Sequence, residues 1–167
     1  MSEIITGRCK GAFNCKYLAF TDPKLQRKFR LPLVHIRLKN GNMSIRTDAL
    51  VDSGATATFI PVELAEVLDI DFPKETSEAV GAGGSFPTFN CTIDRIDILK
   101  GTRIFCYLKN FPVTIPTKED MIPHTILGRD SVFWDNDITF RERKQRTVFR
   151  TPKKKSNNYK KTLSKLE

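Results

Sequence analysis

The chain has 167 residues, of which 40% are hydrophobic and 28% are charged. These proportions are typical of one globular domain with a hydrophobic core and exclude a disordered chain. No segment approaches the roughly 20 consecutive apolar residues that cross a bilayer. Residues 1–5 lack the charged start and apolar run of a signal peptide. We therefore expect a cytoplasmic protein that does not enter a membrane.

The net charge of +9 is concentrated at one end of the sequence. Residues 141–167 hold eleven of the 28 basic side chains and two of the 19 acidic ones, so residues 1–140 carry no net charge. A short lysine-rich end is usually a solvated tail, and we expect a disordered one over residues 151–167. Binding of nucleic acid or another polyanion through residues 141–167 is the alternative.

The cysteines show no metal-binding spacing. They are Cys9, Cys15, Cys91 and Cys106. None belongs to a C-x-x-C pair, and neither His35 nor His124 lies at ligand spacing from them, so we expect no metal site. Reduced, partly buried thiols are the expected state, and a bridge between Cys9 and Cys15 is the alternative.

The first clear elements form a hairpin. Residues 1–30 show no clear period, and we treat them as an N-terminal extension of unassigned role. Residues 33–38 predict a strand, and Asn40-Gly41 is a strong hairpin signal. The returning strand, residues 43–51, leads directly to Asp52.

A helix and a glycine-rich stretch follow this acid. Residues 59–60 predict a short strand, and Pro61 opens a helix that runs through residue 68. Residues 81–84 then contain three glycines in four positions. A phosphate-binding loop should open a helix and usually carries a lysine, whereas residues 86–89 are poor helix formers. We therefore predict a flexible hairpin tip there.

The rest of the chain is rich in strand signals. Strands are predicted at residues 92–99, 103–108, 122–127, 137–141 and 147–150, with a short helix at residues 129–134. No repeat of fixed period occurs. The pattern predicts a mostly β domain with antiparallel strands and one or two short helices.

One acidic turn has the character of a reactive site. Asp52, Ser53 and Gly54 lie between two apolar runs. Partial burial of such a carboxyl group suits proton exchange near neutral or mildly acidic pH. An acid that caps its own turn is the structural alternative. A second apolar segment, residues 126–130 (ILGRD), supplies a candidate partner for this turn.

Three motifs, in this order, resemble those of retropepsin-like aspartic proteases, the single-domain class that includes retroviral enzymes and prokaryotic relatives. They are residues 50–55 (LVDSGA), 81–84 (GAGG) and 126–130 (ILGRD). The resemblance implies a closed antiparallel β-barrel with a flap hairpin and one or two short helices. It divides the chain into an extension (1–30), a protease domain (31–150) and a basic tail (151–167).

The resemblance implies hydrolysis of peptide bonds without a cofactor. Two carboxylates that share one proton can perform it, because one activates a water as base while the other donates to the carbonyl oxygen. The sequence contains a single Asp-Ser-Gly, so one chain cannot supply both carboxylates. The resemblance therefore implies a homodimer in which each subunit contributes Asp52.

The roles of the motif residues carry over by position. The catalytic turn consists of Asp52, Ser53 and Gly54. The substrate-binding residues are Ala55 and Thr56 beside this turn, and Gly81, Ala82, Gly83 and Gly84 in the flap. The residues that support the site from beneath are Ile126, Leu127, Gly128 and Arg129. Retroviral members place an acid at the position of Thr56, where it pairs with the arginine of the second motif, so the partner of Arg129 is left open here.

Two functions of different classes follow. The first is a homodimeric aspartic endopeptidase that cuts extended peptides lying between the flaps and the acidic turns. The second is a retropepsin fold used for binding or regulation, with weak or no proteolysis, whose basic tail recruits nucleic acid or a protein partner. The intact turn at residues 52–54 favours the first function, since a binding module needs no isolated buried acid.

Overall fold

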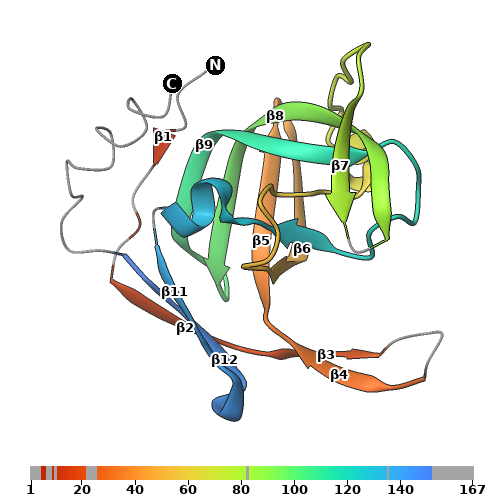
Figure 1. Cartoon of the computed structure of the whole chain (residues 1–167). Coiled ribbons are helices and arrows are strands. Elements are labelled where there is room, and N and C mark those ends of the chain that lie inside the picture. Colours follow the sequence, from red (N-terminus) through yellow and green to blue (C-terminus); the bar gives the residue numbers. More distant parts are fainter. Residues whose placement is uncertain are drawn as a thin grey trace, which may run out of the picture.

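The computed structural model describes residues 5–6, 9, 11–21, 26–81, 83–134 and 136–151. The molecule consists mainly of β-strands (Figure 1). Beyond Thr151, the expected basic tail lies outside the described residues, and so does Ala82.

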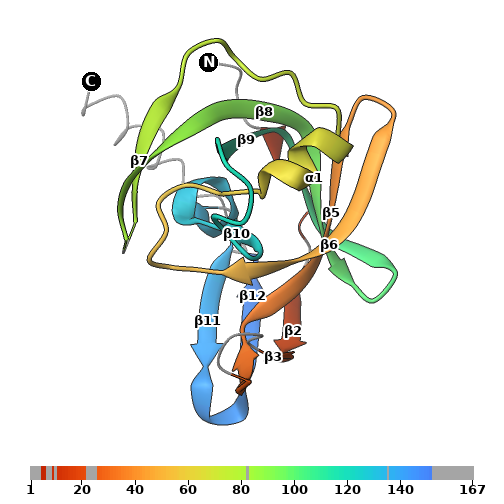
Figure 2. The same cartoon turned by 90° about the vertical axis from the view of Figure 1, so that its right-hand side faces the viewer.

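The main sheet has seven strands in the order β1-β9-β8-β5-β6-β10, with β7 paired to β8. Their bounds are β1 (Ile5–Thr6), β5 (Leu33–Asn40), β6 (Met43–Val51), β7 (Ser77–Gly81), β8 (Gly84–Lys100), β9 (Arg103–Pro116) and β10 (Thr125–Leu127). The long strands β8 and β9 arch across the molecule in both views (Figures 1 and 2). The predicted hairpin is present, since β5 and β6 pair from Leu33↔Leu50 to Asn40↔Met43.

The core lies on one face of this sheet. Alternation along β5 buries Val34, Ile36 and Leu38 and leaves His35 exposed, as expected for a strand with one covered face. The short helix α1 (Val62–Val67) follows Pro61 and packs its buried side chains against the same core. These elements give the acidic turn at the end of β6 a rigid support.

The mostly β prediction is confirmed, but the closed barrel is not found. The main sheet is an open path, because no pairing among the described residues joins β1 to β10. The two end strands have only two and three residues, and among the described residues β9 and β10 are linked only by the isolated bridges of Phe59 to Thr114 and Ile126. The helix expected at residues 129–134 is a π-helical turn, η1 (Arg129–Phe133), which leaves α1 as the α-helix of the described chain. Neither is long and apolar enough to span a membrane.

The N-terminal segment forms strands that the sequence pattern did not reveal. A second sheet has the order β11-β12-β2, and a separate hairpin is made of β3 and β4. Their bounds are β2 (Ala12–Lys16), β3 (Leu18–Thr21), β4 (Lys28–Leu31), β11 (Asp137–Arg141) and β12 (Arg146–Arg150), with a 3₁₀ turn, η2 (Glu142–Lys144), between the last two. The rings of Phe13 and Phe149 stack across β2 and β12 at 5.8 Å. Both sheets extend from the lower side of the body (Figure 2).

The cysteines correct one prediction. Cys9 and Cys106 form a disulfide across a separation of 97 residues. The expectation of reduced thiols is therefore wrong for this pair, and a bridge between Cys9 and Cys15 is ruled out. Cys15 and Cys91 are free and half-buried, and burial raises the pKa of both thiols.

Tyr17 joins the N-terminal segment to the β11–β12 turn. Its side chain is buried, and its hydroxyl group donates a hydrogen bond to Glu142 Oε2 at 2.9 Å. Burial, together with the hydrogen bond and the charge of Glu142, raises the pKa of Tyr17 to about 12. An unfolded tyrosine ionises near 10, so this contact depends on pH.

We expect the contribution of Tyr17 to the free energy of unfolding to decrease in alkaline solution. Between pH 10 and 12 the folded state keeps a proton that the unfolded state has lost, so the free energy of unfolding falls as pH rises. Urea unfolding of wild type and Tyr17→Phe over this range measures the effect. The advantage of wild type should shrink from pH 10 to 12, and parallel curves for the two proteins would contradict the assignment.

Candidate active site

Two strands that end at the same edge hold Asp52. β10 runs parallel to β6 with Leu127 opposite Val51. The Val51 amide donates to Pro32 O at 3.0 Å, and the Asp52 amide donates to Leu127 O at 3.1 Å. Backbone bonds on both sides therefore fix the point at which the chain leaves β6 and enters the acidic turn.

The Asp52 carboxylate is half-buried and oriented by its own turn. Its Oδ1 atom accepts a hydrogen bond of 2.8 Å from the Gly54 amide. A Cβ atom on Gly54 would lie 3.1 Å from this oxygen, which is a tight contact. The other carboxylate oxygen accepts no hydrogen bond within the described part of the chain. Asp52 therefore caps its own turn through Oδ1, as in the structural alternative, and its Oδ2 atom stays available for another partner.

The second motif lies directly against the chain that follows Asp52, here called the acid loop (residues 52–58). Arg129 N donates to Ala55 O at 2.9 Å, and Asp130 N donates to Thr56 O at 2.9 Å. Just beyond the loop, Phe59 and Ile126 exchange backbone bonds of 2.9 and 2.8 Å. The two motifs thus form one hydrogen-bonded unit.

Gly128 allows the closest approach in this unit. A Cβ atom at this position would lie 2.1 Å from Ala57 O and 2.4 Å from Ala57 C. Both atoms belong to the backbone, so no side-chain rotation can relieve the contact. Ile126 and Leu127 belong to β10, which pairs with β6, and Leu127 is fully buried.

The structure shows a partner for Arg129, which the sequence left open. Its Nη2 atom donates to Thr56 Oγ1 at 3.4 Å. A hydroxyl group therefore stands where retroviral relatives have a carboxylate, and the contact is a long neutral–cation hydrogen bond rather than an ion pair.

The glycine-rich residues form the tip of the β7–β8 hairpin, as predicted. Gly81 pairs with Gly84, whose φ of +106° suits glycine. Val80 beside this tip is 83% exposed. The ring of Phe86 lies 6.2 Å from that of Phe59, so the hairpin contacts the segment that leaves the acid loop. Ala82 lies outside the described residues.

Sequence reasoning gave no role to Thr58, which lies between the two motifs. This residue is fully buried, and its hydroxyl group accepts a hydrogen bond of 3.2 Å from the Gly128 amide. The same hydroxyl group donates to Asp130 Oδ1 at 3.4 Å. The signal that could have revealed it is a hydroxyl-bearing residue just before the apolar pair at residues 59–60, because a buried hydroxyl group needs a partner.

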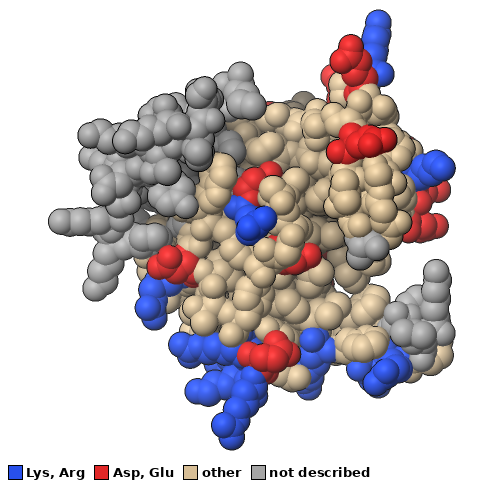
Figure 3. All heavy atoms as spheres, viewed as in Figure 1, with Lys and Arg blue, Asp and Glu red and all other residues tan. Residues whose placement is uncertain are grey.

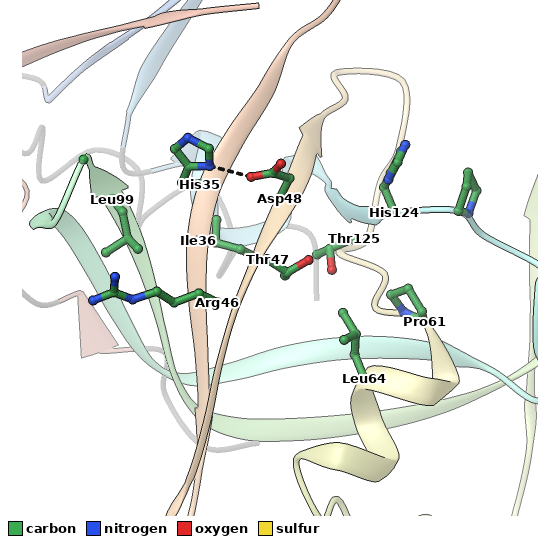
Figure 4. Close-up of a pocket in the computed structure, with 12 residues that line it drawn as sticks. His35, Ile36, Arg46, Thr47, Asp48, Pro61, Leu64, Leu99, His124 and Thr125 are labelled. Atoms are coloured by element: carbon green, nitrogen blue, oxygen red, sulfur yellow. Dashed lines mark hydrogen bonds and ion pairs between the residues drawn. The ribbon is translucent and has the colours of Figure 1, made fainter. Parts of the chain in front are cut away.

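A hollow of about 740 Å³ lies away from the acid loop. His35 and Asp48 face one another across β5 and β6 at its rim (Figure 4). Arg46 and Leu64 lie on opposite sides of these strands in the same view. The polar groups therefore do not converge on one point, and none of the residues predicted for the site lines the hollow. Nor do the described residues contain a group of acids, histidines or cysteines placed to hold a metal ion.

Comparisons with known proteins agree with this site. A family model described as aspartyl protease matches residues 34–131, a span that includes Asp52, the hairpin tip and the second motif. The chain therefore belongs to the aspartyl protease family. Among solved structures, a retropepsin-like aspartic protease from Rickettsia conorii matches with a TM-score of 0.55 and 14% identity, over 83% of this chain and 98% of that one. No curated protein matches the chain. The predicted resemblance to retropepsin-like aspartic proteases is confirmed.

Proposed function

We propose that the protein is an aspartic endopeptidase that acts as a homodimer, with one Asp52 from each subunit. The observation that carries this proposal is the acidic turn itself. Gly54 binds one oxygen of the Asp52 carboxylate, and the other oxygen accepts nothing from the described residues. Since the sequence has one Asp-Ser-Gly, a second copy of the chain is the source of the second carboxylate.

The chemistry needs the two carboxylates to share one proton. Two negative charges so close cannot both persist, so one carboxyl group stays protonated and the pair titrates as a unit. The ionised carboxylate removes a proton from a water, and the resulting hydroxide attacks the peptide carbonyl carbon. The protonated partner donates its proton to the carbonyl oxygen. The carboxyl group that took the proton from water then gives it to the amide nitrogen, while the other carboxylate takes a proton from a hydroxyl group of the tetrahedral intermediate. The C–N bond breaks, an amine and a carboxylic acid leave, and the pair again holds one proton.

A two-fold dimer places identical turns opposite one another. Ser53 is exposed, and its hydroxyl group makes no hydrogen bond to the described part of its own chain. We assign it a bond across the dimer axis that holds the two acid loops in register. Gly54 is exposed beside it, where the absence of a side chain leaves room for a substrate backbone.

The β7–β8 hairpin is proposed as the flap. Its exposed apolar tip at Val80 and its contact through Phe86 suit a segment that closes over an extended peptide and excludes water. Ala55, Thr56 and residues 81–84 would line the bound peptide. We assign the protease domain to residues 31–150 and the basic tail to residues 151–167, with cytoplasmic action on peptides or proteins.

Cleavage of a mixed peptide library at several acidic pH values tests the proposal. Wild type should cut, with a rate that falls above neutral pH, because one proton must stay on the pair. Sedimentation at micromolar concentration should show a dimer. A verified dimer that cuts nothing, or a rate that keeps rising above neutral pH, would contradict the mechanism.

One observation favours the binding function as a second candidate. Lys16, Arg146 and Arg141 lie opposite one another across β2, β12 and β11. Like charges in register destabilise a sheet, and none of the three forms an ion pair with a described residue. Basic side chains gather at this lower end of the molecule (Figure 3). The binding function predicts salt-sensitive binding of an anionic polymer that persists in Asp52→Asn.

A further inference from the structure

Thr58 and Asp130 connect the far end of the acid loop to the second motif. The Thr58 hydroxyl group accepts from Gly128 N at 3.2 Å and donates to Asp130 Oδ1 at 3.4 Å. It is fully buried, so neither contact is exchanged with water at low cost. This single hydroxyl group therefore serves two residues of the second motif.

Asp130 also contacts the acid loop through its own backbone. Its backbone amide donates to Thr56 O at 2.9 Å. Burial raises the pKa of its carboxyl group, and the contacts with Thr58 oppose this with a smaller effect. The residue is half-buried, and its carboxylate accepts the hydrogen bond of 3.4 Å from the Thr58 hydroxyl group of the acid loop.

The two ends of the acid loop are thus fixed to the same short segment. The loop begins where Asp52 N bonds Leu127 O, and it ends where Thr58 bonds Gly128 and Asp130. A shift of residues 127–130 therefore moves both ends of the loop together. Displacement of a reacting group by about 1 Å costs on the order of 100-fold in rate.

We propose that Thr58 and Asp130 form a buried latch that positions the acid loop, so that Asp52 faces its counterpart at the distance hydrolysis requires. The proposal rests on the endopeptidase function stated above. Both residues are positioning residues, since neither reaches the reacting atoms.

The test is a set of kcat and KM values for variants of the full chain. Thr58→Val keeps the shape and removes the hydroxyl group, and we expect kcat to fall about 10- to 100-fold with KM within about twofold. Thr58→Ser restores the hydroxyl group and should recover most of kcat. Thr125→Val is the matched control, because Thr125 is 1% exposed and its hydroxyl group has no hydrogen-bond partner among the described residues.

A double variant shows whether Thr58 and Asp130 act together, as a latch requires, or affect kcat independently of one another. Asp130→Ala removes the acceptor of the Thr58 hydroxyl group but keeps the bond that this group accepts from Gly128 N, so Thr58→Val added to it should lower kcat by a smaller factor than it does in wild type. Losses that multiply would overturn the latch, as would a Thr58→Val enzyme with the kcat of wild type. Should Thr58→Val fail to fold, Thr58→Ser and Asp130→Asn carry the test, with kcat retained in the first and lowered about tenfold in the second.

Failure of the latch and failure of the endopeptidase function give different results. Cleavage that depends on Asp52 but not on Thr58 overturns the latch alone. If wild type shows no cleavage, the function fails, and the latch is judged by the urea midpoint of unfolding. A midpoint lowered in Thr58→Val and unchanged in Thr125→Val then supports the latch, while equal midpoints overturn it.

Discussion

Replacement of Asp52 by asparagine should lower kcat/KM for peptide cleavage by about 10⁴-fold or more, because the proposed dimer would lose its base and its acid together. The fold and the dimer should survive. Asparagine has the shape of aspartate, and its side-chain oxygen can still accept the 2.8 Å hydrogen bond from the Gly54 amide. The measurements are kcat/KM, the thermal unfolding midpoint and sedimentation of both proteins.

Asp94→Asn provides the matched control for this change. Asp94 is exposed, and its Oδ2 atom accepts a hydrogen bond of 2.8 Å from the Gly41 amide. It binds a glycine amide as Asp52 does, but at the β5–β6 turn. We expect wild-type kcat/KM for Asp94→Asn. Cleavage that survives in Asp52→Asn would rule out the carboxylate mechanism.

Substitution of Gly128 by alanine should be the most damaging change to stability. The new Cβ atom would lie 2.1 Å from Ala57 O, and relief requires a movement of the backbone. We expect the free energy of unfolding to fall by about 3 kcal/mol or more, with loss of cleavage, because the acid loop bonds to residues 127–130 on both sides of the clash. Urea unfolding measures the loss.

Gly83→Ala is the control for the added methyl group. A Cβ atom there meets nothing within 4 Å, and the residue needs no left-handed backbone. Its unfolding free energy should stay within about 0.5 kcal/mol of wild type. A loss of less than about 1 kcal/mol in Gly128→Ala would show that the acid loop moves freely against the second motif, contrary to the contacts described.

Local signals explain the parts of the fold that the sequence predicted well. Asn40-Gly41 placed the β5–β6 turn, and Pro61 with the apolar spacing after it placed α1. Each depends on residues close together in the chain. The strands β2, β3 and β4 were missed because residues 1–30 show no clear period in the sequence.

Long-range contacts account for what the sequence could not supply. The pairing of β12 with β2 brings together residues near the two ends of the described chain. The disulfide joins Cys9 to Cys106, which is 97 residues away. The prediction of a closed barrel was wrong for a similar reason. Strand signals in the sequence do not show which strands pair, and they did not show that β1 and β10 have only two and three residues. Closure depends on such partners and lengths.

The candidate site was predicted from the order of the motifs in the sequence. The hydrogen bonds within the site could not be predicted in this way. The turn at Asp52 and the segment that begins at Ile126 were paired from the resemblance, and the structure brings them together. The hydroxyl bond from Arg129 to Thr56 and the bonds of Thr58 depend on side-chain positions. A motif gives residue types in order, whereas these bonds follow from the angle at which two segments meet.

The parallel pairing of β6 with β10 also constrains when this site can form. Residues 49–51 lie beside residues 125–127, so most of the chain must emerge from the ribosome before Asp52 gains its support. Contacts between such distant residues close late and slowly in folding. A nascent chain that ends before residue 127 therefore contains Asp52 but lacks the strand that holds it. The proposed cleavage activity therefore requires synthesis of the chain at least to residue 127.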